Sequence, residues 1–308
     1  MRNALVRAGG VPARAQVRTR VAQPVSRPFA SGRVVEGSRI REIDCGSPTH
    51  APDGVGFADG IQRWVLEGHL QLAPIVRAHV AAAVLVRDDG RFRAETCETE
   101  EFLVVPGGRV TPAQLAALQD TGLVVHETDP ADRAHPIVDR YSAVQVVERR
   151  REAVERRAVT AYVQRHPHAW VVVDGPIGSF GNESAASRAV GLIKTHDTQF
   201  LEGADLEIAL TLRAGHRSSV FERSVHGRHA VYSWYLRLWP WHDEDLLHGL
   251  TRLERRPDPA AIAEADEVSC WMLAERAPLS APEARWDRLI YPIREVETYL
   301  RARAGGWG

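Results

Sequence analysis

The chain has 308 residues, of which 44% are hydrophobic and 26% are charged, the proportions of an ordinary soluble globular protein. Its formal net charge of −1 excludes a general polycation, so any contact with nucleic acid must come from local basic patches. Three cysteines without CxxC spacing exclude a disulfide framework or a zinc knuckle and favour a reducing cytoplasm, and no apolar run approaches the roughly 20 residues of a membrane span.

The first 50 residues differ in composition from the rest of the chain. Seven arginines and no acidic residue precede Glu36, and the segment lacks the apolar core of a signal peptide. Such a segment is typical of a disordered arm that binds DNA or a partner, of a transit peptide, or of an extension from a misjudged start codon. We therefore predict a disordered basic tail over residues 1–50 and one folded domain over residues 51–308.

The folded part opens with strand signals. Turn residues at 67–68 and at 88–90 separate three apolar stretches, which predicts an antiparallel meander. Thr111 is a suitable N-cap for a short helix that Gly122 ends. The three strands are expected over residues 55–64, 72–87 and 93–105, and the helix over residues 112–119.

The longest helix is predicted over residues 137–165, where apolar residues recur near the 3.6-residue period. The remaining positions are densely charged, which is typical of a solvated helix face. Glu155 and Glu152 precede the apolar strand at 170–173 by about one helix length, and a helix that runs back beside that strand can bring one of them to Asp174 at its end.

Strands and helices mix in the second half of the chain. The stretch AVGLIKTH reads as a strand that carries Lys194 and His196 on the same side. This order of elements predicts an α/β fold with a mixed sheet flanked by helices. The further elements are helices over residues 201–212, 260–275 and 285–303 and strands over residues 218–225, 230–238 and 246–254.

Two Asp-Gly pairs stand out because each adjoins an apolar strand. Asp59-Gly60 and Asp174-Gly175 either form turns or bring two carboxylates to one edge of the sheet. A carboxylate at the end of an apolar strand is costly to bury without a partner, and paired carboxylates hold hard divalent cations for phosphodiester chemistry. The chain offers no GxSxG, P-loop or GxGxxG signature for other chemistry.

From about Gly54 onward the chain resembles the NurA nucleases. The motifs that carry the resemblance follow in order: ADGIQR, a charged helix before WVVVDGPIG, VGLIKTH, YSWYLRL, HGLTRLER and a late Tyr-Pro before the last helix. The resemblance implies an RNase H-like fold related to the Piwi domain, with Mn²⁺-dependent exonuclease and endonuclease activity on single-stranded DNA. It also implies a homodimer that works with the hexameric ATPase HerA in DNA end resection.

Carried over by position, the resemblance assigns a metal site and a phosphate contact. Asp59 and Asp174 match the family's metal-binding aspartates, Glu155 is the choice for the helical glutamate with Glu152 as the alternative, and Lys194 matches the family's VGxxK lysine. We treat these four residues as catalytic candidates and the three carboxylates as ligands of Mn²⁺ or Mg²⁺.

The fourth ligand of the family is left open. A His or Asp usually follows the late Tyr-Pro motif, whereas here Tyr299 stands near that place with Glu295 and Glu297 close by. Further DNA contacts are expected at Arg63, His196, Trp239 and Trp241, although a histidine or a strand tryptophan more often has a structural role.

The sequence thus predicts a cytoplasmic, metal-dependent DNA nuclease that acts on single strands or DNA ends with a HerA-like ATPase. Two alternatives remain open. One is an RNase H-like nuclease that acts on RNA or in phage defence, because oxygen-ligated metals cut both nucleic acids. The other is a non-catalytic partner subunit of a hexameric ATPase. The region after Tyr291-Pro292 supports this alternative because it departs from the pattern of the NurA nucleases.

Overall fold

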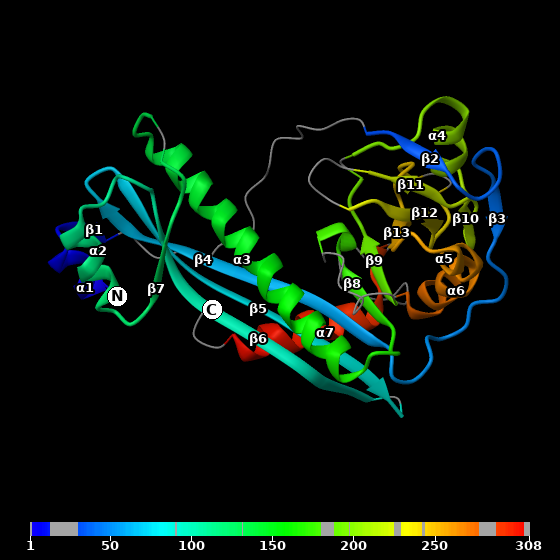
Figure 1. Ribbon diagram of the computed structural model, residues 1–308, viewed down its shortest axis with the longest axis horizontal. Coiled ribbons are helices and arrows are strands. Elements are labelled where there is room, and N and C mark those ends of the chain that lie inside the picture. The colour runs from blue at the N-terminus through cyan, green and yellow to red at the C-terminus, as the bar shows by residue number, and fades with distance from the viewer. Residues whose placement is uncertain are drawn as a thin grey trace.

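One mixed β-sheet runs through the whole molecule in the computed structural model (Figure 1). The structure describes residues 2–12, 30–89, 91–130, 132–179, 188–196, 198–224, 229–241, 244–276 and 288–304. Thirteen strands of these residues form the sheet, and its central path follows the order β2-β11-β12-β13-β9-β8-β4-β5-β6-β7. The predicted α/β class with a mixed sheet and flanking helices is confirmed by this arrangement.

The predicted meander forms the long arm of the sheet. Strands β4 (Gly56–Leu70), β5 (Ala73–Asp88) and β6 (Arg91–Val105) pair antiparallel along nearly their whole length. The first turn lies at Gln71-Leu72 rather than at 67–68, because Gln71 adopts the positive φ of 55° that the turn requires. The register shift between Leu66 and Gly68 shows that the glycine marks a β-bulge inside β4 instead.

Helices cover both faces of this arm. Helix α3 (Pro136–Arg165) crosses one face diagonally, where Val144, Val147 and Val154 pack against Val80 and Ala82 of β5 (Figure 1). Helix α7 (Tyr291–Arg303) packs on the other face. Because alternate residues of a strand point to opposite faces, β4 contributes Phe57 to the α7 side and Ala58 to the α3 side.

The second half of the chain builds the rest of the sheet. Strands β8 (Val171–Asp174) and β9 (Ala189–Ile193) run parallel to β4, and β13 (Leu250–Arg255), β12 (Val231–Arg237) and β11 (Phe221–Arg223) continue antiparallel. Helix α6 (Ala265–Glu275) packs beside α7 over this half. The centre of the sheet is therefore parallel, and on both sides it joins antiparallel strands, with β7 added in parallel at the outer edge of β6.

Several predicted bounds differ from the observed ones. The strand expected over 189–196 ends at Ile193, so the strand alternation that placed Lys194 and His196 on one side does not apply to them. The helix expected over 260–275 breaks at Glu264 into α5 (Pro259–Ala263) and α6. Residue 225, at the end of a predicted strand, and residues 285–287, at the start of the last predicted helix, lie outside the described residues.

The described parts of the predicted tail belong to the sheet. Strand β1 (Gly10–Pro12) follows α1 (Arg2–Arg7) and pairs with β4, β2 (Gly32–Val34) pairs with β11, and β3 (Glu42–Asp44) pairs with β10 (His216–Ser218). Short segments of low hydrophobicity are ordered here because open strand edges supply backbone hydrogen bonds. Residues 13–29 of the segment lie outside the described residues.

The remaining elements lie at the ends of the sheet. The helix predicted over 112–119 is confirmed as α2 (Pro112–Gln119), whose N-cap Thr111 and Gln114 form a capping box. It leads into β7 (Val124–Glu127), and α4 (Gly203–Leu210) precedes β10. Within the described residues, no helix combines the length and the apolar character that crossing a membrane would need.

Candidate functional site

The two aspartates of the Asp-Gly pairs lie side by side. Strands β4 and β8 are parallel, and their register pairs Phe57 with Val172 and Ala58 with Val173. The next position along both strands brings Asp59 and Asp174 together, which is the juxtaposition that the sequence suggested. Asp59 is 7% exposed, whereas the side chain of Asp174 is 25% exposed.

A turn-forming role does not account for either aspartate. Strand β4 continues without interruption through Asp59-Gly60, so this pair forms no turn. Gly175 does bend the chain after β8, with φ of 138°, but the described partner of the Asp174 side chain is Lys194 rather than the turn backbone. Asp59 Oδ1 accepts a local hydrogen bond of 2.7 Å from the backbone N–H of Gly60, but this bond sits within a continuous strand and leaves the second carboxylate oxygen to other partners.

Lys194 is held against Asp174. The lysine Nζ donates a hydrogen bond of 3.0 Å to Asp174 Oδ2, and the lysine side chain is only 15% exposed. Because β9 pairs Leu192 with Asp174, the loop that starts after Ile193 returns Lys194 to the carboxylate. A lysine placed in this way is a point charge that can serve a carboxylate or a phosphate.

Glu155 reaches the same place from α3 on the other face of the sheet. Its carboxylate is buried and accepts a hydrogen bond of 2.7 Å from Arg151 Nη1, one helical turn earlier. A Cβ on Gly60 would lie 3.3 Å from Glu155 Oε2, so the glycine lets the helix and its glutamate approach β4. Glu152 is exposed, which favours Glu155 as the helical carboxylate of the site.

The edge of β4 beside the site lacks a neighbouring strand. Among the described strands, β8 pairs with this side of β4 at residues 56–58 and β1 pairs at residues 68–70. The stretch from Asp59 to Glu67 therefore faces no partner strand within the described chain. This opening explains how carboxylates from both faces of the sheet meet at one place.

Burial and mutual repulsion raise the pKa of two of these carboxyl groups. Burial raises the pKa of Asp59 well above its ordinary value, Asp174, Glu155 and Glu297 add to the shift, and Lys194 opposes it. Burial likewise raises the pKa of Glu155 to about 7, with Arg151 opposing and Asp174 and Glu152 adding to it. For both groups the effect of burial outweighs the opposing effect of the nearby cation.

Glu297 is the acidic residue of α7 that acts on Asp59. Asp59 shares the α7 face of β4 with Phe57 and Ile61, which pack against apolar residues of the same helix. Glu297 Oε1 accepts a hydrogen bond of 2.5 Å from Arg301. Of the residues that follow Tyr291-Pro292, Glu297 is therefore the one whose charge adds to the raised pKa of Asp59.

The donor set suits a hard divalent cation in its chemistry but not in its present side-chain placement. All the candidate ligands are carboxylate oxygens, which Mg²⁺ and Mn²⁺ prefer. Within the described part of the chain, however, no group of three or more His, Cys, Asp or Glu side chains is placed to hold a metal ion. Lys194 and Arg151 instead occupy one oxygen each of Asp174 and Glu155.

A second buried carboxylate supports the turn after Asp174. Glu254 on β13 is fully buried, and its Oε2 accepts a hydrogen bond of 3.2 Å from the backbone N–H of Ile177. Its Oε1 accepts bonds of 2.6 and 2.5 Å from Arg223 and Arg252. Both guanidinium groups lie near the ring of Phe200, at 5.3 and 4.8 Å from its centre. This cluster was not predicted from the sequence, although TRLER places an arginine and a glutamate two residues apart, on the same face of a strand.

The other predicted DNA contacts are scattered. His196 packs on Tyr235 and bonds to the Leu250 carbonyl through Nε2, and burial lowers the pKa of its imidazole to about 4. Trp239 packs against the core on the α7 side, and the guanidinium of Arg276 stacks on its ring at 4.0 Å. Arg63 and Trp241 are half-buried. None of these contacts joins these residues to Asp59 or Asp174.

Comparison with known proteins gives a structural likeness but no match in sequence. No known sequence family matches the chain, and no curated protein matches it. The crystal structure of the NurA nuclease from Sulfolobus solfataricus is similar over 84% of this chain and 81% of that one, with 8% identity and a TM-score of 0.46. A likeness of this size assigns neither a fold family nor an activity, so the function is inferred below from the chain's own residues.

Proposed function

We propose that the protein is a metal-dependent nuclease that hydrolyses DNA phosphodiester bonds with Asp59, Asp174, Glu155 and Lys194. The observation that supports this most strongly is the placement of two aspartates on adjacent parallel strands, beside a buried glutamate and a lysine. Burial of several carboxylates at one place is costly unless a cation neutralises them. The motifs shared with the NurA nucleases point to the same chemistry.

In this proposal Asp59, Asp174 and Glu155 would hold Mn²⁺ or Mg²⁺. The bound ion would supply charge neutralisation at the phosphate and an activated water. Lys194 would turn its ammonium group from Asp174 to a phosphate oxygen of the strand, since one lysine cannot fully serve both. Arg151 would keep its hold on Glu155 and so orient that carboxylate toward Gly60.

The proposed substrate, oligomeric state and partner rest on the resemblance of the sequence to the NurA nucleases. The protein would act on single strands or DNA ends as a homodimer with an RNase H-like catalytic core, together with a HerA-like hexameric ATPase. A competing proposal is a non-catalytic subunit of such an ATPase. It is favoured by the ion pairs that Asp174 and Glu155 already form with Lys194 and Arg151.

Cleavage of end-labelled single-stranded DNA and RNA with Mn²⁺, Mg²⁺ or EDTA tests the proposal. We expect metal-dependent cutting that Asp59→Asn and Asp174→Asn each reduce about a thousandfold or more, because each removes a charged oxygen ligand. Glu42→Gln, which alters a carboxylate on β3 paired with Arg213, is the matched control. If wild type and both variants are equally inert with and without the ATPase, the protein is the non-catalytic subunit.

A further inference from the structure

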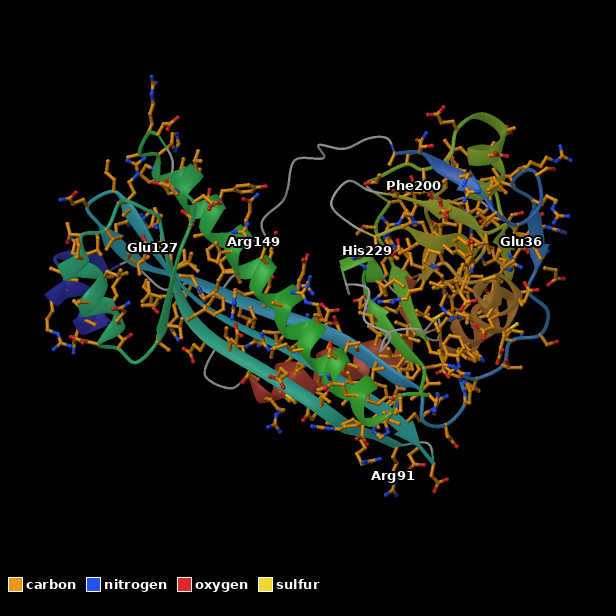
Figure 2. The ribbon with its side chains drawn as sticks, in the orientation of Figure 1. Glu36, Arg91, Glu127, Arg149, Phe200 and His229 are labelled. Atoms are coloured by element: carbon orange, nitrogen blue, oxygen red, sulfur yellow. The ribbon has the colours of Figure 1, made fainter. Side chains whose placement is uncertain are left out.

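A cavity of about 860 Å³ opens on the α7 side of the sheet, apart from the carboxylates. It lies where β5 ends and β6 begins, next to the hairpin that carries Arg91 (Figure 2). Its walls also include the end of α6 and the first residue of α7. The volume suits a small organic ligand rather than a single ion.

Two aromatic rings form one wall of the cavity. Phe92 of β6 and Tyr291 of α7 approach with ring centres 6.1 Å apart and planes inclined by 57°. Tyr291 is 44% exposed, although it follows a buried isoleucine at the start of a helix. Exposed aromatic rings at the edge of a cavity are suited to stack on a planar ring of a ligand.

The cavity is also lined by two arginines whose side chains are engaged in different ways. Arg87 is engaged by the buried carboxylate of Glu275, which also accepts bonds from His50 Nδ1 and the backbone of Ala51. Arg276 has no acidic partner among the described residues; it stacks on Trp239 and donates to the Leu238 carbonyl. Its guanidinium therefore retains donor capacity for an anion that enters the cavity.

The cavity also has an acceptor that can read the edge of a base. Asp53 lines it beside Pro52. A carboxylate in this position repels a bare phosphate, but it accepts hydrogen bonds from an exocyclic amino group. The combination of a stacking wall, a guanidinium that is not ion-paired with a described carboxylate, and a carboxylate suits a nucleotide better than it suits an inorganic anion.

Helix α7 links the cavity to the candidate active site. Tyr291 at the start of the helix lines the cavity, and Val296 further along packs in one cluster with Phe57 and Ile61, the residues two positions before and after Asp59 on the same face of β4. One helix therefore covers both the edge of the cavity and the strand that carries Asp59.

We propose that this cavity binds one nucleotide unit, with its base stacked on Tyr291 and Phe92 and its phosphate held by Arg276. The inference rests on the proposed nuclease function insofar as the nucleotide belongs to the strand being cut. A free mononucleotide carries the same base and phosphate and is the other source of this ligand.

Equilibrium binding in EDTA tests the inference without requiring cleavage. The probes are deoxyadenosine monophosphate, deoxyadenosine, and a short oligodeoxyadenylate with either a normal or an abasic terminal residue. We expect Tyr291→Ala to weaken binding roughly fivefold to a hundredfold, as loss of one stacking contact does, whereas Tyr291→Phe retains it. Leu72→Ala, which truncates an exposed side chain at the β4–β5 turn, is the control and leaves binding unchanged.

The outcomes separate this inference from the proposed function. The inference is supported if Tyr291→Ala weakens nucleotide binding, Tyr291→Phe retains it, and deoxyadenosine binds more weakly than its monophosphate. This result supports nucleotide binding in the cavity even if the protein does not cut DNA. A preference for the intact oligonucleotide over its abasic form assigns the site to a strand, and equal affinity for the mononucleotide assigns it to a free nucleotide. Unchanged binding in both Tyr291→Ala and Arg276→Gln, with unaltered circular dichroism, overturns the inference.

Discussion

Glu254 on β13 and the group of Asp59, Asp174 and Glu155 at β4 and β8 are separated by strand β9 of the same sheet, and the neutralisation of their charges differs. Glu254 is bonded by two guanidinium groups and a backbone N–H, so its charge is matched inside the fold. Asp59 and Glu155 share one place with Asp174, and only Lys194 and Arg151 oppose them there. A matched buried carboxylate holds the structure together, whereas an unmatched group is destabilising and marks a place where a cation would bind.

Removal of the matched charge gives the largest expected loss of stability. Glu254→Gln leaves Arg223 and Arg252 without their carboxylate in a buried setting, and we expect the free energy of unfolding to fall by about 3 to 5 kcal/mol. Urea denaturation measures this change. Double replacement of Glu254 and Arg252 by apolar residues should lower the free energy of unfolding less than Glu254→Gln alone. A larger decrease in the double variant would show that an unpaired buried charge is not the cause of the destabilisation.

Asp59→Asn is expected to change stability in the opposite direction. It removes a buried, repelled charge and retains the shape of the side chain, so in EDTA near pH 8 the free energy of unfolding should rise. Urea denaturation of both proteins under the same conditions measures the change. A loss of stability comparable to that of Glu254→Gln would show that Asp59 has a structural role.

The stability of the metal-free protein should depend on pH in the same sense. Glu155 titrates near 7 when folded and near 4.5 when unfolded, so between these values the folded chain holds a proton that the unfolded chain has released. Stability contributed by the neutral group is therefore lost as pH rises through about 7, by about 3 kcal/mol in total. Glu155→Gln should flatten this part of the profile in EDTA. An identical slope in the variant contradicts the assignment.

The smallest predicted effect concerns the approach of α3 to β4. In Gly60→Ala the new methyl group would meet Glu155 Oε2 at 3.3 Å and displace that carboxylate by a few tenths of an ångström. We expect Mn²⁺ affinity to fall severalfold, about 1 kcal/mol, with little change in the unfolding transition. Equal metal affinity in Gly60→Ala and wild type would place Glu155 outside the ligand set.

The sequence predicts local elements of this fold better than it predicts their contacts. The capping box at Thr111 and the periodicity of α3 are local signals, and both elements are confirmed. The turn at Gln71 gave no signal because a glutamine rarely adopts positive φ, and the glycine nearby marks a bulge. Likewise, β1 and β2 are ordered by strands far along the chain, which composition does not reveal.

The site was predicted in the same partial way. The two Asp-Gly pairs identified the aspartates, since charge beside an apolar strand is a local signal, and the buried position of Glu155 follows the helical phase. Arg151 lies four residues before Glu155, a spacing that the sequence displays. The hydrogen bond from Ile177 to Glu254 and the cavity beside Tyr291 both arise from long-range packing, and no sequence motif predicts them.

Direct binding of Mn²⁺ near pH 8, measured by titration calorimetry, tests the central claim that the unmatched carboxylates hold a divalent cation. We expect the wild-type protein to bind Mn²⁺ saturably and to release protons on binding. Binding should be lost in the Asp59→Asn, Asp174→Asn double variant and retained in the Glu42→Gln control. Absence of binding by folded wild type, or equal binding by the double variant, would contradict it.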